Sequence, residues 1–410
     1  MTTDLRPDAV LAQARSLLPE IVEVRRRLHR VPEVGLRLPK TQAITAEQVR
    51  ALGLEPVLGR STTSVVAVIQ GTKPGPGADR TIVLRGDMDG LPLTEETGLA
   101  FSSEHAGSMH ACGHDTHVAM LLGGARLLVD RREAFAGRAV LMFQPGEEGF
   151  HGAKVMIEDG FLEGIEGTPG AAAFALHIST RYPTGTLNVR HGALLAAADR
   201  LLLTVRGRGG HASAPFLALD PVTIAAELVI ALQLMITRTV DALNPAVLTI
   251  ARLSAGTTNN IIPPSAELEG TLRTLDEAVR AAVKDRIRQV AAGVGAAHGA
   301  LIDVEIEPGY PVTYDDRAFT DLVRAVSAEL VGPEATVEMD APIMGAEDFS
   351  YVLQRVPGMM AFLGARPAGI DPATAPMNHS NLVVFDEPAM AVGAAAYAAV
   401  ALRHLGATGS

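Results

Sequence analysis

The order of strand and helix patterns along the chain constrains its fold more than any other feature. In the first 190 residues, apolar runs typical of buried strands, such as 64–70 and 81–87, alternate with a run of helical periodicity at 114–130. The same alternation resumes after about residue 310. Because helices that alternate with strands cover the faces of the sheet they connect, these outer parts predict an α/β sheet with helices on its faces.

A segment with a different order lies between these outer parts. A strand pattern at 199–209 and a helix pattern at 220–238 are followed by two strands, a second helix and a final strand. The order β-α-β-β-α-β is that of a ferredoxin-like unit. Since compact units are tolerated as insertions in surface loops, we expect a domain at 193–308, inserted into an outer domain made of 1–192 and 309–410.

Charge, cysteine content and hydropathy limit the partners and the compartment. A formal net charge of −11, without a long run of Lys and Arg, argues against a nucleic-acid partner. Cys112 is the only cysteine, so the chain cannot form an intramolecular disulfide, which suits a reducing compartment. The first 30 residues have the pattern of an amphipathic helix, and no apolar run reaches membrane-spanning length. We therefore expect a cytoplasmic protein without membrane association.

Ionisable residues near the ends of apolar strands are the candidates for chemistry, because ligands of open α/β sheets bind beyond the carboxyl ends of the strands. Taken singly, each has an ordinary alternative: the acidic pairs as turns or caps, and the cysteine and histidines as core residues. Together they supply thiolate, imidazole and carboxylate groups, which suit first-row divalent ions and a site for one or two of them. The spacing does not match a structural zinc knuckle. The candidates are Cys112, His114, Glu148, His177 and His379, with Asp87, Asp89 and Glu147 beside them.

Several motifs together establish a resemblance to a known family. The stretches are MHACGHDTHVAM, FQPGEEG, GRGGHASAP, NNIIPPSAELEGTLRT and MGAEDFSYVL, and the match extends over nearly the whole chain. The chain resembles the M20 metallopeptidase superfamily, and within it the N-acyl-amino-acid amidohydrolases, which include hippurate hydrolases and auxin-conjugate hydrolases. The resemblance implies a zinc-peptidase-like catalytic domain with helices on both faces of a mixed sheet. A ferredoxin-like α+β lid or dimerisation domain would interrupt it.

The resemblance also implies roles for individual residues. Glu147 would be the general base, and Asp89 would orient groups near the metal. In the inserted domain, His211 would reach the reacting carbonyl, while Asn260 and Arg273 would lie near the substrate's carboxylate. Without the resemblance, His211 would be taken for a polar turn residue and Arg273 for a surface residue of a strand. The implied ligands, for one or two ions of Zn, Mn, Co or Ni, are Cys112, His114, Glu148, His177 and His379.

The implied activity is hydrolysis of the amide bond of N-acyl amino acids, such as N-acetyl or N-benzoyl derivatives, by a homodimer that uses metal-activated water. A dipeptidase or carboxypeptidase of the same superfamily is the alternative. A cysteine hydrolase using Cys112 would leave the other candidate residues unexplained. A non-catalytic binding protein would be favoured if Glu147 were missing, but Glu147 is present. Phe216 departs from the His that usually follows GGHASAP, so a hydrogen bond to a ligand there is not expected.

Overall fold

The computed structural model describes residues 4–75 and 77–406. Contacts within the chain divide it into two compact units. The first unit comprises Met1–Gly192, Tyr314–Ala341 and Tyr351–Ser410, and the second comprises Ala193–Thr313 and Pro342–Ser350. The second unit therefore extends beyond the range 193–308 suggested by the sequence. One reason is that the Ala196 amide donates a hydrogen bond to the carbonyl of Ile343 at 3.1 Å.

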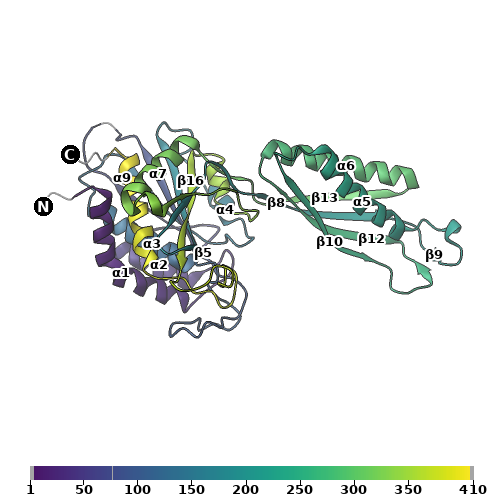
Figure 1. Ribbon diagram of the computed structural model, residues 1–410, viewed down its shortest axis with the longest axis horizontal. Coiled ribbons are helices and arrows are strands. Elements are labelled where there is room, and N and C mark those ends of the chain that lie inside the picture. The colour runs from purple at the N-terminus through teal and green to yellow at the C-terminus, as the bar shows by residue number, and fades with distance from the viewer. Residues whose placement is uncertain (1–3, 76, 407–410) are drawn as a thin grey trace. The chain divides into compact units, whose positions relative to one another are not determined.

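The first unit is built on an eight-stranded mixed sheet (Figure 1). The strands of this sheet, in spatial order, are β1 (Val57–Leu58), β2 (Val65–Gln70), β4 (Arg138–Gln144), β3 (Thr81–Asp87), β5 (Ala171–Pro183), β16 (Gly358–Arg366), β6 (Leu187–Val189) and β15 (Thr336–Glu338). β3 pairs in parallel with β4 and β5, and β16 pairs in parallel with β5. β2 runs antiparallel to β4, and β6 runs antiparallel to β16. The carboxyl ends of β3, β4 and β5 thus meet at one edge.

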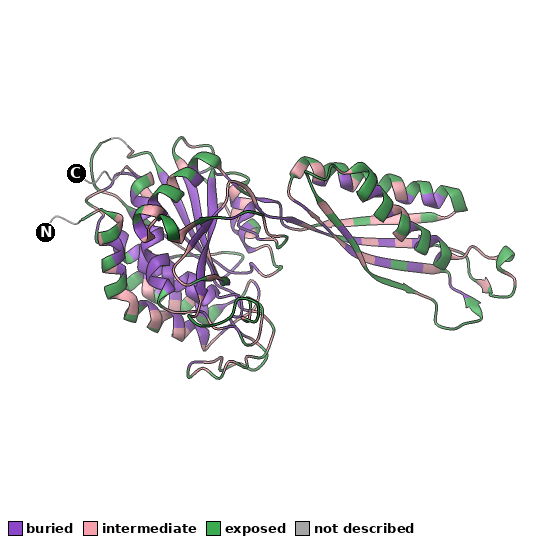
Figure 2. Ribbon diagram, viewed as in Figure 1, coloured by how far each residue is buried: buried purple, intermediate pink, exposed green. Residues whose placement is uncertain are grey.

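The helices of this unit pack on the sheet and on one another. They are α1 (Pro7–His29), α2 (Pro39–Ala51), α3 (His114–Val129), α4 (Gly152–Glu158), α7 (Arg317–Val331), the short α8 (Ser350–Leu353), η2 (Pro333–Ala335) and α9 (Ala389–His404). α9 is apolar on every side and is buried from Ala389 to Leu402, as expected for a helix inside a core. It packs closely on α3, where a Cβ atom at Gly393 would lie 2.1 Å from the sulfur of Met120. Figure 2 shows this buried layer of helices and strands.

The second unit is a four-stranded antiparallel sheet with two helices on one face (Figure 1). In chain order its elements are β8 (Ala197–Arg206), α5 (Pro221–Thr239), β10 (Ala246–Ala255), β12 (Ser265–Thr274), α6 (Glu277–His298) and β13 (Leu301–Pro308). The strand order is β10-β12-β8-β13, which is the ferredoxin-like arrangement. The predicted fold class, an α/β sheet interrupted by this insert, is confirmed.

Short elements complete the chain. β9 (Gly210–His211) pairs with β11 (Ile261–Ile262), η1 covers Pro215–Leu217, and β7 (Gly192–Leu195) pairs with β14 (Thr313–Asp315). An aspartate caps the N-terminus of each of the two long helices of the second unit. The Asp220 carboxylate accepts a hydrogen bond from the Val222 amide at 2.9 Å, and Asp276 accepts one from the Val279 amide at 2.8 Å. Both are ordinary N-cap interactions.

Helix α5 differs from the expectation that no apolar run reaches membrane-spanning length. It is the one described helix whose length and composition would suffice to cross a membrane. Its most apolar 18-residue stretch has a mean hydropathy of 1.5, and 28% of that stretch is buried. One helix of this kind is weak support for a membrane span, because core helices of globular domains pass the same test. Ile224, Leu228 and Leu232 face the core of the second unit, whereas Ile230 and Leu234 are 61% and 57% exposed.

Candidate metal centre

Strand ends and the loops that follow them bring the candidate residues together in the first unit. β3 ends at Asp87, with Asp89 just beyond it, and Glu147 follows shortly after the end of β4. His177 lies on β5, beyond the last residue of β5 that pairs with β3. β5 does not end at His177, as the apolar run suggested, but continues to Pro183 because it remains paired with β16.

Of the several groups of ligand-type atoms that lie close together, two share Cys112. Cys112, His114 and His177 form the first group, and Cys112, Glu148 and His379 form the second, with ligand atoms within 4.8 Å of one another in each group. Sγ of Cys112 lies 3.3 Å from Nε2 of His177, and Nε2 of His379 lies 3.1 Å from Oε1 of Glu148. The structure therefore brings all five candidate ligands together around a single thiol.

The donor set fits a divalent cation. His114 is fully buried, and neither of its ring nitrogens has a hydrogen-bond partner within the described residues. An unsatisfied buried polar atom costs about 1–3 kcal/mol, which a bound cation would relieve. Thiolate, imidazole and carboxylate donors together suit Zn²⁺, Mn²⁺, Co²⁺ or Ni²⁺.

A hydrogen bond selects the ring nitrogen that His177 presents to the cluster, and nearby carboxylates surround His114. Nδ1 of His177 donates to the carbonyl of Ile178 at 2.7 Å, so Nε2 carries the lone pair that faces Cys112. Nδ1 of His114 lies 3.4 Å from Oδ1 of Asp89, and its Nε2 lies 4.0 Å from carboxylate oxygens of both Glu147 and Glu148. Outer partners of this kind fix the orientation of metal-binding rings.

Asp89 also organises the acidic pair. Its Oδ1 accepts a hydrogen bond from the Glu147 amide at 3.0 Å, and its Oδ2 accepts one from the Glu148 amide at 3.1 Å. Because both backbone amides are held by one carboxylate, the two neighbouring side chains are kept in a defined turn. Glu147 and Glu148 can then take separate roles, with Glu148 among the ligands and Glu147 beside them.

Asp87 forms a buried network that the sequence indicated only as part of an Asp-x-Asp pair. It accepts hydrogen bonds from the Arg85 guanidinium and from Nδ1 of His117, the latter at 2.5 Å. Nε2 of His117 in turn accepts a hydrogen bond from the Ile178 amide at 2.8 Å. The three side chains thus connect β3, α3 and the residue that follows His177 on β5. Arg85 is close to Asp87 in the sequence, but His117 and Ile178 are distant, so no local pattern identifies these two partners.

The charges in the site control its protonation. Burial raises the pKa of the Cys112 thiol well above its ordinary value, and the carboxylates of Glu148 and Glu147 raise it further. Burial acts to lower the pKa of His114, but Asp87 and Asp89 outweigh this and raise it to about 10. Since only the thiolate and the neutral imidazole are ligands, metal binding must displace protons from both residues.

Backbone strain marks the loop that carries His379. His379 has a φ of 72°, in the left-handed region, and His151 (φ 57°) is the other described residue besides glycine with a positive φ. Such a conformation costs of the order of 1–3 kcal/mol and persists where surrounding contacts enforce it. The His379 amide donates to the carbonyl of Ala111 at 2.9 Å. The strained residue is therefore tied to the chain next to Cys112.

A second buried ionic cluster lies behind the first turn of α3. The Asp115 carboxylate accepts hydrogen bonds from Nε of Arg25 at 2.7 Å and from Nδ1 of His29 at 2.8 Å. Nε2 of His29 faces the carboxylate of Glu95, whose side chain is 2% exposed. Arg25 belongs to the short basic run Arg25–Arg27, and its side chain is 1% exposed. In the structure it anchors α1 to the helix that begins with His114.

The remaining predicted residues lie in the second unit. His211 is exposed on β9, and its Nδ1 accepts hydrogen bonds from the amide and hydroxyl of Ser213 at 3.1 and 2.7 Å, which leaves Nε2 as the donor in the neutral ring. The carbonyl of Asn260 accepts a hydrogen bond from the Ala212 amide, so Asn260 and His211 are neighbours. Arg273 is half-buried on β12, and Phe216 is 82% exposed.

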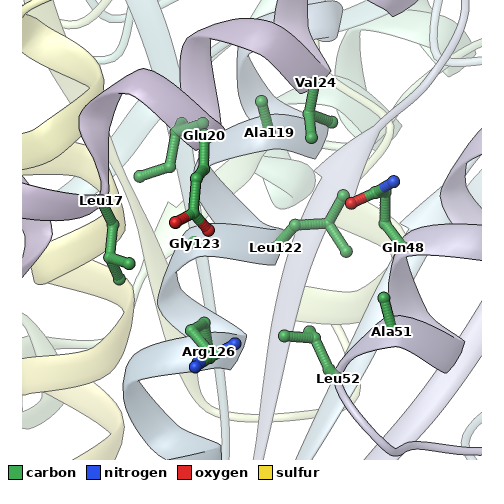
Figure 3. Close-up of a pocket in the computed structure, with 11 residues that line it drawn as sticks. Leu17, Glu20, Val24, Gln48, Ala51, Leu52, Ala119, Leu122, Gly123 and Arg126 are labelled. Atoms are coloured by element: carbon green, nitrogen blue, oxygen red, sulfur yellow. The ribbon is translucent and has the colours of Figure 1, made fainter.

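A hollow elsewhere on the first unit is not the metal centre. It lies between α1, α2 and α3 (Figure 3), has an empty volume of about 530 Å³ and is lined mainly by apolar side chains. Glu20 and Arg126 are its charged lining residues, and it contains none of the candidate ligands. Without a cluster of ligating or nucleophilic groups, this hollow offers no chemistry comparable to that around Cys112.

Comparisons with known proteins agree with this geometry. Residues 83–403 match the peptidase family M20/M25/M40. The chain is 40% identical over 390 residues to thermostable carboxypeptidase 2 of Saccharolobus solfataricus, which covers 93% of this chain and 95% of that protein. It is 38% identical over 349 residues to N-acetyl-L-cysteine deacetylase of Bacillus subtilis, and the match covers 85% of this chain and 81% of that protein.

A solved structure is similar over almost its whole length. The crystal structure of the YxeP protein of Bacillus subtilis, described as a dinuclear metal binding peptidase, has a TM-score of 0.81 and 30% identity to this chain. The match covers 96% of this chain and 99% of that one. The two units described above therefore occur in a related protein of known structure.

Proposed function

This chain belongs to peptidase family M20/M25/M40, and on that premise we propose that it hydrolyses the amide bond of N-acyl amino acids. Family membership makes it a metal-dependent amidohydrolase. The substrate is our proposal, and it is supported by the similarity to an N-acetyl-L-cysteine deacetylase. The observation that carries the proposed chemistry is the pair of ligand groups sharing Cys112, with Glu147 directly beside them.

Cys112, His114, Glu148, His177 and His379 would hold one or two ions, which supply Lewis acidity and lower the pKa of a coordinated water toward about 7. The Glu147 carboxylate takes a proton from the attacking water and returns it to the nitrogen of the leaving amino acid. Asp89 keeps Glu147 and Glu148 in place through their backbone amides. The largely buried surroundings of Glu147 limit the access of other water to the proton it holds.

Three residues of the second unit would act on the substrate. The protonated Nε2 of His211 is a suitable donor to the oxygen of the reacting carbonyl, and one such donor is typically worth about 10²–10³ in rate. Arg273 would pair with the free carboxylate of the amino acid through its guanidinium fork. Asn260, next to His211, would hydrogen-bond near the same carboxylate of the substrate.

A carboxypeptidase is the second candidate, favoured by the 40% identity to a thermostable carboxypeptidase. Both substrates end in an amino acid with a free carboxylate and differ only in the acyl side of the scissile amide. The proposed Arg273 contact would therefore serve either reaction. Separating the two candidates requires substrates that vary the acyl group and keep the leaving amino acid constant.

We also propose that two copies of the chain associate through the second unit. Helix α5 exposes the apolar side chains of Val222, Ile230 and Leu234. β10 is an edge strand, with Val247 and Leu253 each 45% exposed. An antiparallel pairing of an edge strand with its own copy is self-complementary, so it closes a twofold dimer and covers the edge.

The single thiol suits a reducing, cytoplasmic setting.

Amine release from matched substrates tests the function. N-acetyl, N-benzoyl and glycyl derivatives of one amino acid would be assayed as purified, after chelation, and after adding back Zn²⁺, Mn²⁺, Co²⁺ or Ni²⁺. We expect cleavage of the N-acyl amino acids that chelation abolishes and one of the ions restores. The same substrates with an amidated carboxylate test the role of Arg273 and should be poor. Cleavage that survives complete metal removal would refute the mechanism, and preference for the peptides would favour the carboxypeptidase.

A further inference from the structure

The side chain of Asn378 is not a candidate ligand, but it bonds to the backbone of segments that carry candidate ligands. One side-chain amide nitrogen, Nδ2, donates hydrogen bonds to two backbone carbonyls on different segments: Cys112 at 3.0 Å and Ile178 at 2.9 Å. Both partners are carbonyl oxygens, so only the amide nitrogen, with its two N–H groups, can satisfy them. Both donors are used in full, which makes the contact a clamp between the two segments.

Each segment held by this clamp carries a candidate ligand. Cys112 is itself the residue shared by both ligand groups. Ile178 directly follows His177, and its carbonyl also accepts the hydrogen bond that fixes the tautomer of His177. Asn378 directly precedes His379, the strained residue of the second group. A single side chain therefore connects the backbone of Cys112 with the segments that carry His177 and His379.

Neighbouring contacts hold the same loop in the same place. The His379 amide bonds to Ala111, the residue before Cys112, at 2.9 Å. The Thr180 hydroxyl on β5 donates to the carbonyl of Pro376 at 2.8 Å. These two bonds align the loop with the Cys112 segment and with β5 separately. The Asn378 amide is the contact that joins all three at one point.

We propose that Asn378 is a positioning residue of the metal centre, whose amide clamp sets the placement of Cys112 and His177 relative to His379. The inference rests on the proposed function only through the ligand assignment. Residues that orient metal ligands from behind typically contribute 10–100-fold to metal affinity. Asn378 touches no candidate ligand atom through its side chain, so its effect must pass through the backbone of the ligand segments.

The test measures metal binding directly, with Zn²⁺ and Co²⁺ as probes on the full chain. Asn378→Ala removes both hydrogen bonds, and Asn378→Ser keeps a hydroxyl that can serve one carbonyl. Asn381→Ala is the matched control, because it removes an asparagine amide from the same loop that bonds instead to Glu96 at 2.8 Å. Metal affinity would be determined by titration against a competing chelator, and the ligand field by the absorption spectrum of the Co²⁺ form.

We expect the affinity to fall about 10–100-fold in Asn378→Ala, with a changed Co²⁺ spectrum. Asn378→Ser should be intermediate, and Asn381→Ala should match the wild type. Wild-type affinity and spectrum in Asn378→Ala, with only a lower melting temperature, would overturn the proposal, because the clamp would then be merely structural. If Asn378→Ala does not fold, Asn378→Ser decides by the same readouts: a lowered affinity supports the proposal, and wild-type affinity and spectrum overturn it. A wild-type chain that binds neither ion would refute the proposed function as well.

Discussion

Sγ of Cys112 lies 3.3 Å from Nε2 of His177, although 65 residues separate them in the chain. The contact exists because the loop before α3 passes over the part of β5 that follows its pairing with β3. Gly113 permits this approach: its φ is 91°, and a Cβ atom there would lie 2.4 Å from a methyl carbon of Ile178. The thiol is thereby placed where both ligand groups can share it.

Replacing Cys112 tests its place at the centre of both groups. Cys112→Ser should lower metal affinity by at least 10-fold, because a neutral hydroxyl replaces the only thiolate. Cys112→Asp restores a negative charge that can reach two ions and should retain more metal than Cys112→Ser. Metal content per chain after dialysis measures both variants. Full occupancy in Cys112→Ser would show that the thiol is not a ligand.

Glu147→Gln separates proton transfer from metal binding. The amide cannot accept a proton from water, so the rate should fall about 10²–10⁴-fold while metal content stays unchanged. Initial rates of amine release and elemental analysis of the same preparation provide the two readouts. Glu163→Gln, an exposed change of the same kind, is the control. A variant that keeps near-wild-type activity would reject Glu147 as the base.

Glu95 should make folding stability depend on pH. Burial acts to raise the pKa of this carboxyl, but hydrogen bonds from His29, the Ser103 amide and the Thr97 hydroxyl lower it from 4.5 to about 2. A pKa lowered in the folded state stabilises the fold above pH 4.5, and this stability is lost as the pH falls through about 2. The ionised Glu95 carboxylate is therefore expected to stabilise the fold at neutral pH.

Glu95→Gln should therefore be less stable than the wild type at pH 7, and the gap should narrow steadily below pH 4.5. Urea unfolding of both proteins at stepwise pH values from 7 to 3 measures it. Glu96→Gln, next along the chain and exposed, serves as the control. A gap that stays constant over this range would mean that the Glu95 charge does not support the fold.

The exposed side of α5 predicts the effect of charge on assembly. Ile230→Lys combined with Leu234→Lys should convert a dimer to a monomer, because two buried charges per subunit would face each other across the twofold axis. Light scattering after size exclusion measures the mass. Gln289→Lys, on the exposed side of α6, should leave the assembly intact. A wild-type monomer, or a double variant that remains dimeric, would contradict this interface.

Sequence patterns predicted the architecture because each pattern is local. Alternating apolar runs and helical periodicity determine which segments become strands or helices, and their order along the chain identified the β-α-β-β-α-β insert. The ligand candidates could also be identified from the sequence, since Cys112, His114 and the Glu147–Glu148 pair are unusual residue types next to strand or helix ends. The membrane-length composition of α5 was not anticipated, because Glu227 and Arg238 interrupt the apolar run in the sequence.

The partners of the site were decided by the tertiary structure alone. In the sequence, Asn378 looks like an ordinary loop asparagine, and Arg25 looks like part of a short basic run. Their roles come from hydrogen bonds to segments 266 and 90 residues away, namely the Cys112 carbonyl and the Asp115 carboxylate. Residue type and spacing determine which groups can bind a metal. Which of them face one another, and what holds them there, depends on long-range packing that brings distant backbone atoms within hydrogen-bonding distance.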